Sequence, residues 1–337
     1  MENLLAAWRE FLRGKRKKRD VQEFQYKLMD NILALHRDLK YGHGVSIFRY
    51  KHGGYKHFRI SDPKPRDIHK ATVRDRLLHH ALYRKLYPFF DRTFIADSYS
   101  CRKGKGTHKA MNRFRQFAYK VSENHTRTCW VLKCDIRKFF ASIDHCILND
   151  IVCRYIPDTR TRALIVEVIA SFRSAANPFR TRRVLNGFGG SQTSTKGLPL
   201  GNLTSQLLVN IYMNEFDQFV KHQLKVQYYV RYADDFVFLS HDKASLFEIE
   251  RYIATFLRER LELALHPDKV SIATFASGID FLGWVHFSDH RVLRTATKRR
   301  MMRRLRETEE EEIVTSYLGL LSHGNARRLA RRVRKNR

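Results

Sequence analysis

The amino-acid sequence predicts an α+β fold, because segments with helical periodicity alternate with short runs of β-branched and aromatic residues. Helical spacing is clearest in residues 1–40 and 203–222. The strand-like runs are clearest in residues 128–143 and 228–240, and aspartates interrupt both runs. A chain of 337 residues with 43% apolar residues can bury a core, which predicts one multi-lobed enzyme or two tightly joined units.

The chain is basic along nearly its whole length. Lys and Arg number 64 against 34 Asp and Glu, giving a formal net charge of +30, which predicts a polyanionic partner. No apolar run approaches the roughly 18 residues of a membrane-spanning helix, and the N-terminus lacks the apolar region of a signal peptide. We therefore expect a soluble, unexported protein with no membrane partner. The five cysteines form no Cys-x-x-Cys pair, which argues against disulfide and zinc frameworks.

The first part of the chain is predicted to change from helices to hairpins. Residues 1–40 place leucines and aromatics at helical spacing around the charged stretch RGKRKKRD, which predicts a basic helical N-terminal extension. Residues 41–68 contain glycines, aromatics and short alternating runs, which predict β-hairpins with Gly53 and Gly54 as a turn. Helices are expected to resume at about Val73.

The remaining elements follow in order. Residues 128–143 read as a buried strand that passes into a turn or short helix, and residues 203–222 read as an amphipathic helix after the turn GLPLGN. Residues 228–240, YYVRYADDFVFLS, predict two short strands joined by a tight turn at Ala233 and Asp234. A helix is expected over residues 243–263. Residues 291–337 carry two Arg-rich blocks and predict a small helical lobe with a basic face.

The adjacent acids Asp234 and Asp235 indicate a metal site at the predicted hairpin tip. Two carboxylates held together repel each other unless a strong cation neutralises them. Mg²⁺ prefers oxygen ligands, and a third carboxylate on a neighbouring strand, Asp135, would complete a two-metal site of the kind used for phosphoryl transfer. From residue type alone, the two acids are equally compatible with the cap of a solvated hairpin turn.

Six motifs in one order resemble those of the reverse transcriptases. They are RDIHKATVRDR (66–76), DIRKFF (135–140), GLPLGNLTSQ (197–206), YADD (232–235), LHPDKV (265–270) and FLGW (281–284). The resemblance covers most of the chain, from about Arg66 to Trp284. It implies an RNA-directed DNA polymerase, a nucleotidyltransferase that copies RNA into cDNA. It also implies a right-hand fold with fingers, an antiparallel palm sheet packed on helices, and a short helical thumb.

The resemblance divides the chain into six segments. They are a basic helical N-terminal extension (1–40), the first part of the fingers (41–125), the first part of the palm (126–147), the second part of the fingers (148–196), the second part of the palm (197–286) and a helical basic thumb (287–337).

The catalytic residues implied by the resemblance are three acids and a lysine. Asp135, Asp234 and Asp235 are implied as ligands of two Mg²⁺ ions, for which Mn²⁺ can substitute, with Ile136 as a further ligand beside the first acid. Lys269 is implied as the proton donor to the departing pyrophosphate, where a lysine offsets developing negative charge. A surface lysine after a helix is the alternative for Lys269.

The implied nucleotide-binding residues are Lys64, Arg66, Phe140, Leu200, Gly201 and Gln206. Arg66 and Lys64 would contact the triphosphate, and the planar fork of the arginine can bind two phosphate oxygens at once. The ring of Phe140 would lie under the incoming sugar and leave no room for a 2′-hydroxyl, which favours deoxynucleotides. Gly201 lets the backbone approach the nucleotide. Gln206 would support the template side, or lie on a helix surface.

Template and primer contacts are implied in two places. CRKGKGTHKA places Arg102, Lys103, Lys105 and His108 around two glycines, which suits contacts with strand phosphates, although a solvated basic loop is the alternative. The primer-grip turn comprises Phe281, Leu282, Gly283 and Trp284.

Four features most resemble the reverse transcriptases of diversity-generating retroelements. They are SYSCRKGKGTHKA (98–110), the pocket turn, SYLGLLSHGNARRL (316–329) and the short thumb. In that family the pocket turn carries an aliphatic residue, here Leu200, and the enzymes are associated with error-prone copying of template adenines during mutagenic retrohoming. An aliphatic side chain supplies no hydrogen bond to nucleotide or template, so a mispair loses less relative to a correct pair.

The resemblance also implies partners and a source. The partners are template RNA, the RNA/cDNA duplex, deoxynucleoside triphosphates and a small, basic, oligomeric accessory variability protein. The implied source is prokaryotic or phage-encoded, with a cytoplasmic location. Only residues 285–337 follow the FLGW motif, so we expect neither an RNase H domain nor a maturase region. Retron-type and abortive-infection reverse transcriptases stay open, and a non-catalytic RNA-binding scaffold is disfavoured by the presence of all three acids and Lys269.

Overall fold

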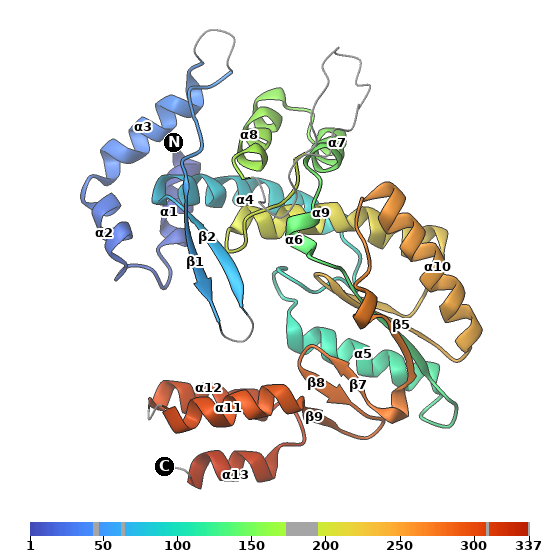
Figure 1. Ribbon diagram of the computed structural model, residues 1–337. Coiled ribbons are helices and arrows are strands. Elements are labelled where there is room, and N and C mark those ends of the chain that lie inside the picture. Colours follow the sequence, from blue (N-terminus) through green and yellow to red (C-terminus); the bar gives the residue numbers. More distant parts are fainter. Residues whose placement is uncertain (43–46, 62–64, 173–194, 308–309, 336–337) are drawn as a thin grey trace. The chain divides into compact units, whose positions relative to one another are not determined.

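The computed structural model of the protein describes residues 1–42, 47–61, 65–172, 195–307 and 310–335. The chain forms two compact units, each assembled from separate segments. Unit 1 comprises Met1–Ile95, Lys138–Asp217 and Arg258–Leu263, and unit 2 comprises Ala96–Arg137, Gln218–Leu257 and Ala264–Arg337. Helices and strands both occur in the chain, as the predicted α+β class requires (Figure 1).

Unit 1 is mostly helical. Its elements are α1 (Glu2–Phe11), α2 (Arg19–Tyr26), α3 (Leu28–Lys40), β1 (Tyr55–Ile60), β2 (Arg66–Ala71), α4 (Val73–Thr93), α6 (Phe139–Ser142), α7 (His145–Tyr155), α8 (Thr159–Ala170) and nearly all of α9 (Leu203–Gln218). The apolar faces of α1 to α3 meet α4 in one core, which includes Trp8, Phe11, Ile32, Leu35 and Leu77. The helices predicted from spacing in residues 1–40 are therefore confirmed.

The strands β1 and β2 form an antiparallel hairpin, with Tyr55 opposite Ala71 at its base. The prediction that Gly53 and Gly54 form the hairpin turn is wrong, because both glycines precede β1. Gly53 instead allows the backbone to lie close to Asp75 in α4, since an added Cβ would lie 2.8 Å from Oδ2 of that residue.

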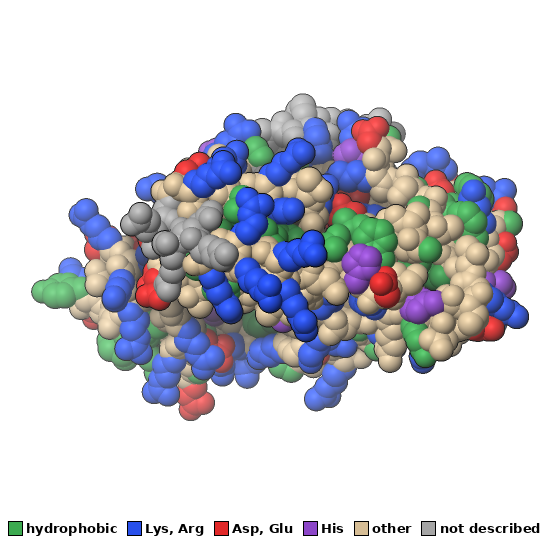
Figure 2. Space-filling view, turned by 90° about the horizontal axis from the view of Figure 1, so that it is seen from below, with side chains coloured by type: hydrophobic (Ala, Val, Ile, Leu, Met, Phe, Trp, Pro, Cys, Tyr) green, Lys and Arg blue, Asp and Glu red, His purple; other side chains and the backbone are tan. Residues whose placement is uncertain are grey.

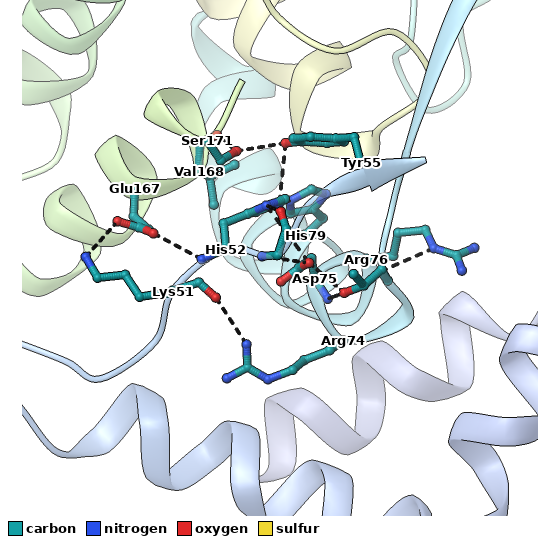
Figure 3. Close-up of polar contacts among 12 residues, drawn as sticks. Lys51, His52, Tyr55, Arg74, Asp75, Arg76, His79, Glu167, Val168 and Ser171 are labelled. Carbon is teal, nitrogen blue, oxygen red and sulfur yellow. Dashed lines mark hydrogen bonds and ion pairs between the residues drawn. The ribbon is translucent and has the colours of Figure 1, made fainter. Parts of the chain in front are cut away.

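A polar network surrounds Asp75 at the start of α4 (Figure 3). Its carboxylate accepts hydrogen bonds from the Tyr50 hydroxyl at 2.7 Å, the Thr72 hydroxyl at 2.6 Å and the Gly53 backbone N–H at 3.1 Å. Thr72 caps α4 and accepts in return from the backbone N–H of Asp75 at 3.2 Å. The buried acid is therefore satisfied, and it ties the chain before β1 to α4.

Two buried histidines extend this network. Nδ1 of His52 lies 2.6 Å from the carbonyl of Gly53, so Nδ1 donates and Nε2 is left as an acceptor. Nε2 of His79 lies 3.2 Å from Nε2 of His52 and therefore donates to it. The ring of His52 stacks on the rings of both His79 and Tyr55. The Tyr55 hydroxyl lies 2.8 Å from the Ser171 hydroxyl, at the end of α8. The base of the hairpin is thus held by α4 and α8 (Figure 3).

We expect the free energy of unfolding to fall as the pH drops below about 6.5. Burial lowers the pKa of His79 to about 3, so the unfolded chain takes up a proton before the native chain does. The stabilising contribution is present above the unfolded pKa and is lost by about 1.4 kcal/mol per pH unit below it.

The His79→Asn variant tests this expectation, because asparagine stays polar and does not titrate. The difference in unfolding free energy between wild type and variant, measured by denaturant titration, should narrow by about 2 kcal/mol between about pH 6.5 and about pH 5. A difference that does not change with pH would contradict a neutral, buried His79.

Unit 2 contains two sheets and the C-terminal helices. Its elements are α5 (Thr107–Val121), β3 (Trp130–Asp135), β4 (Tyr229–Tyr232), β5 (Asp235–Ser240), most of α10 (Lys243–Arg260), β6 (Ser271–Thr274), β7 (Ile279–Phe281), β8 (Trp284–His286), β9 (Arg291–Leu293), α11 (Thr295–Glu307), α12 (Glu311–Leu321) and α13 (Arg327–Lys335). None of the described helices combines the length and apolar character that a membrane span requires.

The larger sheet has the strand order β4-β5-β3-β6, and its neighbours are antiparallel. One face packs on α5 through a core that includes Val131, Val230, Val237, Phe114 and Phe117. The other side chains of β3, β4 and β5 are also largely buried. This explains why the strands read as nearly continuous apolar runs in the sequence. The predicted hairpin of residues 228–240, with its turn at 233–234, is confirmed.

The smaller sheet, β7-β8-β9, leads into the three C-terminal helices. A core joins Trp284 of β8 and Leu293 of β9 to Met301, Leu321 and Val333, one from each helix in turn. The helix α5 lies beside β7 and β8 (Figure 1). The helical lobe predicted for residues 291–337 is therefore confirmed, with β9 as a short strand at its start.

Candidate active site

Asp135 and Asp235 lie directly opposite each other in the β3–β5 pair. Opposite residues of an antiparallel pair project from the same face of the sheet. Asp234 lies in the turn before β5, and its carbonyl accepts a hydrogen bond from the backbone N–H of Ile136 at 3.2 Å. The structure thus brings together, within unit 2, the three acids and Ile136 that the sequence assigned to metal binding.

The Asp235 carboxyl group lies in an unfavourable environment. Burial raises the pKa of Asp235 to about 7, with the charges of Asp234 and Asp135 adding to the rise and the charge of Lys133 opposing it. In the part of the chain that the structure describes, its Oδ1 atom is buried without a hydrogen-bond partner. A divalent cation would be a hard, charged partner for this oxygen. The donor set therefore fits Mg²⁺.

Lys133 and Asp280 belong to this site, although the sequence analysis did not identify them. Lys133 precedes Asp135 by two residues on β3 and so projects from the same face, and its Nζ donates to the carbonyl of Asp280. The Asp280 carboxylate pairs with Arg294 at 3.0 Å. The alternation along β3 could have indicated Lys133, whereas no local pattern marks Asp280.

Lys269 lies beside the first acid. It ends a short 3₁₀ turn, Pro267–Lys269, and its Nζ donates to Oδ1 of Asp135 at 2.8 Å. The residue just before this turn, His266, is anchored, because its backbone N–H donates to the carbonyl of Asp135 at 2.8 Å. The Lys269 side chain is 42% exposed, so solvent and ligands can reach its ammonium group.

Among the described residues, no group of three or more His, Cys, Asp and Glu side chains has the arrangement of a metal site.

A buried arginine supports the hairpin tip. Arg231 is 0% exposed, and its guanidinium donates to the carbonyl of Ala233 at 3.1 Å and to the Ser98 hydroxyl at 3.0 Å. Ala233 has a φ of 57°, which is uncommon for a residue other than glycine. Arg231 therefore holds a strained turn between the two strands that carry the tip. Sequence reasoning missed this role, since the arginine stands in an otherwise apolar strand.

Several predicted nucleotide-binding residues lie together in unit 1. Arg66 is exposed at the start of β2, and the carbonyl of Leu200 accepts from the backbone N–H of His69, farther along the same strand, at 3.1 Å. Gly201 has a φ of 101°, and a Cβ there would lie 3.0 Å from Ile68. The pocket turn thus rests against the strand that carries Arg66.

The other predicted nucleotide-binding residues differ in their surroundings. Phe140 is half-buried in α6, and its carbonyl accepts from the backbone N–H of Leu198 at 2.8 Å, which ties α6 to the pocket turn. Gln206 is half-buried in the first turn of α9. Lys64 lies outside the described residues.

Two basic side chains of the predicted template loop form hydrogen bonds with nearby backbone carbonyls. Arg102 donates to the carbonyl of Ser98 at 3.0 Å, and Lys105 donates to the carbonyl of Ala96 at 2.7 Å. Lys103 is exposed. His108, at the start of α5, stacks on His323 with ring centroids 3.5 Å apart. Template binding by this loop stays a prediction.

The FLGW turn connects β7 to β8. Leu282 and Gly283 form its tip with φ values of 54° and 85°, and both are half-buried. Phe281 and Trp284 are buried on either side of the tip. The two buried rings fix the position of the tip, and primer contact by this turn stays a prediction.

Basic side chains cover the C-terminal helices. The exposed ones are Lys298, Arg299, Arg303, Arg304 and Arg306 on α11, and Arg327, Arg328, Arg331, Arg332 and Arg334 on α13. Figure 2 shows a face of the molecule on which Lys and Arg side chains are much more frequent than acidic ones. Such a surface attracts nucleic-acid phosphates.

Comparison with solved structures defines the class of fold. Telomerase from Candida albicans, solved in complex with the TWJ fragment of telomeric RNA, matches with a TM-score of 0.51 at 13% identity, over 86% of this chain and 55% of that chain. The fold is therefore that of the right-hand polymerases, as predicted. Residues 59–286 match the model of the family described as reverse transcriptase (RNA-dependent DNA polymerase), and the chain belongs to this family. The predicted enzyme class is confirmed at the level of the family.

Curated relatives agree with this assignment. Protein YkfC of Escherichia coli K12 is 26% identical over 275 residues, which are 72% of this chain and 67% of YkfC. The group II intron-encoded protein LtrA of Lactococcus lactis subsp. cremoris is 23% identical over 299 residues, which are 70% of this chain and 46% of LtrA. The chain thus spans about two thirds of one relative and less than half of the other. These matches do not address the diversity-generating subclass.

Proposed function

We propose that this chain copies a template RNA into cDNA by two-metal nucleotidyl transfer at the end of the β3–β5 pair. The observation that carries the proposal is the register that sets Asp135 opposite Asp235 and leaves Asp234 at the adjoining tip. The buried, unpartnered Oδ1 of Asp235 supports a cation at this position.

The proposed roles follow from these contacts. Asp135, Asp234 and Asp235, with Ile136 beside them, would hold two Mg²⁺ ions, which would supply positive charge for phosphoryl transfer. Lys269 is a flexible donor that reaches the same site and would give its proton to the leaving pyrophosphate. Lys133 keeps a positive charge beside Asp235 and so reduces repulsion among the acids.

Three further residues are proposed to bind the nucleotide. Arg66 would pair with the triphosphate, and Phe140 would exclude the 2′-hydroxyl of a ribonucleotide. Gly201 would let the backbone of the pocket turn approach the base pair. The exposed arginines of α11 and α13 would grip the phosphates of the template–primer duplex as a thumb.

Primer extension tests this proposal. The purified chain is given an RNA template, a DNA primer, deoxynucleoside triphosphates and Mg²⁺, and we expect a full-length cDNA that disappears when EDTA removes the metal. Ribonucleotides should be incorporated far less well. A folded protein that binds the RNA but extends no primer would favour the non-catalytic scaffold.

We further infer that the chain serves diversity generation, copying a template-repeat RNA with errors at adenines, in partnership with a small basic accessory protein. Leu200 in the pocket turn, the loop of residues 98–110 and the segment of residues 316–329 support this inference. Retron-type and abortive-infection enzymes are the alternatives.

Replacing Leu200 with Gln should make copying of template adenines more accurate, by roughly tenfold. Glutamine offers hydrogen bonds that a correctly paired nucleotide can satisfy better than a mispaired one, whereas leucine offers none. Sequencing cDNA made from a defined RNA, with adenines scored separately, measures the effect. Leu203→Gln is the matched control, since Leu203 is a half-buried leucine in the adjoining helix. Equal adenine error rates in wild type and Leu200→Gln would contradict the role of Leu200.

A further inference from the structure

Besides their shared apolar core, the C-terminal helices contact the rest of unit 2 through the turn of residues 322–325, between α12 and α13. Gly324 in this turn lies against the ring of Trp284, the residue that ends the FLGW turn. A Cβ added to Gly324 would lie 2.0 Å from Cζ3 of Trp284, and all three of its nearest atoms belong to that ring. Trp284 is only 1% exposed, so the rigid ring has little room to move away.

Arg291 of β9 connects the same turn to α5. The backbone N–H of Asn325 donates to the carbonyl of Arg291 at 2.9 Å, and Nε of Arg291 donates to the carbonyl of His323. Nη1 of Arg291 donates to Oδ1 of Asn112 at 3.1 Å. The guanidinium also lies 5.8 Å from the centre of the Trp284 ring. Arg291 is therefore held on several sides at once.

One face of α5 carries the matching contacts. His108, Asn112 and Arg115 lie at helical spacing and point to the same side. The His108 ring stacks on His323, Asn112 accepts from Arg291, and Arg115 donates to the carbonyl of His290 at 2.8 Å. Because the predicted template segment runs into the first turn of α5, this face links that segment to the 322–325 turn.

We propose that Trp284, Arg291, His323, Gly324 and Asn325 form a thumb joint, which fixes the direction of α11, α12 and α13 relative to the FLGW turn. The inference rests on the proposed function and extends it. The joint is a positioning device: it sets how long a template–primer duplex stays bound between nucleotide additions. The acids lie on β3 and β5, whereas the joint lies on β8, β9, α5 and the 322–325 turn.

The physical reason is geometric. Arginines on α11 and α13 bind duplex phosphates wherever the helices point, but they hold a primer end at the FLGW tip only when the helices keep one direction. The absence of a side chain at Gly324 allows the turn to seat on the Trp284 ring. A methyl group there overpacks a closed contact, which is destabilising.

Gly324→Ala compared with Gly319→Ala tests the joint. An added Cβ at Gly319, in α12 of the same lobe, meets nothing within 4 Å, so this variant is the matched control. Extension in the presence of a heparin trap gives the nucleotides added per binding event, and a single-turnover assay gives the rate of the first addition. We expect Gly324→Ala to add roughly fivefold fewer nucleotides per event, with the first addition within about twofold of wild type and Gly319→Ala unchanged.

Two further variants keep the test decisive if Gly324→Ala folds poorly. Arg291→Lys retains the charge but loses the fork that reaches both Asn112 and His323, and it should show the same loss. Trp284→Phe in the Gly324→Ala background removes part of the clashing ring and should restore part of the length. Folded Gly324→Ala and Arg291→Lys proteins with wild-type product lengths would overturn the joint, as would an equal loss in the first addition.

Binding of a labelled RNA–DNA duplex, which needs no chemistry, separates this proposal from the proposed function. If wild type extends no primer, the proposed function fails, yet weaker duplex binding by Gly324→Ala than by Gly319→Ala still supports the joint. Equal duplex affinity of both variants would count against it.

Discussion

Asp235→Asn is expected to abolish RNA-templated DNA synthesis while leaving the fold at least as stable as that of wild type at neutral pH. The substitution keeps the shape of the side chain but removes a charge that the proposed metal ions require. The loss of several kcal/mol of transition-state stabilisation corresponds to a rate about 10³-fold lower or more. Single-turnover primer extension on an RNA template measures this rate.

The charge on Asp235 is expected to lower the free energy of unfolding at high pH. Burial raises the pKa of Asp235 to about 7, from about 3.9 in an unfolded chain, so the native state binds this proton more tightly. The stabilisation from the protonated acid is fully present below about pH 4 and is lost as the pH rises through 7. Asparagine does not ionise, and in EDTA the variant should unfold at the higher temperature at about pH 8.

Asp289→Asn is the control, because this acid is exposed in the β8–β9 turn. It should retain wild-type synthesis and show no such gain in unfolding temperature. Substantial synthesis by Asp235→Asn would refute the metal site. A lower unfolding temperature for Asp235→Asn in EDTA would instead contradict the unfavourable burial of the charge.

Lys269→Ala is expected to lower the rate of nucleotide addition by about 10²-fold or more, the usual contribution of a positioned proton donor. Saturating nucleotide and template should not restore the rate, since the loss occurs in the transition state. Lys269→Arg separates two roles, because arginine keeps the charge but does not release a proton. Recovery with Arg would indicate charge stabilisation alone, and no recovery would indicate proton transfer.

Lys120→Ala serves as the matched control for Lys269→Ala, since Lys120 is an exposed lysine in the last turn of α5. It should add nucleotides at the wild-type rate under the same conditions. A Lys269→Ala rate within about threefold of wild type would remove Lys269 from the proposed mechanism.

Local sequence patterns predicted those helices and strands in which buried apolar residues and exposed polar residues alternate or separate within one short segment. The hairpin of residues 228–240 is the clearest case, because an apolar run interrupted by two acids marks both strands and the turn. The turn of the β1–β2 hairpin was misplaced because Gly53 is required by Asp75, which is distant in sequence. A glycine needed for close approach and a glycine needed for a turn look the same in a sequence.

The candidate site was predicted to the extent that motifs mark it. Asp135, Asp234, Asp235 and Lys269 stand in short motifs, and the structure brings them together. Asp280 and Arg231 could not be found in this way, since their significance arises from contacts with Lys133 and with the Ala233 carbonyl. The Lys133–Asp280 contact joins strands of two different sheets, and Arg231 is also bound to Ser98, which lies far away in the sequence. A single strand does not encode either contact.

The order of strands in the β4-β5-β3-β6 sheet has a consequence for synthesis on the ribosome. Among the described strands, β3 pairs with β5 and β6, and the paired residues Asp135 and Asp235 are 100 residues apart in the chain. At about 5–20 residues per second, the apolar β3 segment waits roughly 5–20 s for its first neighbour. During that interval α5, which is made shortly before β3 and shares an apolar core with it through Phe114 and Val131, can already shield part of the strand from premature association.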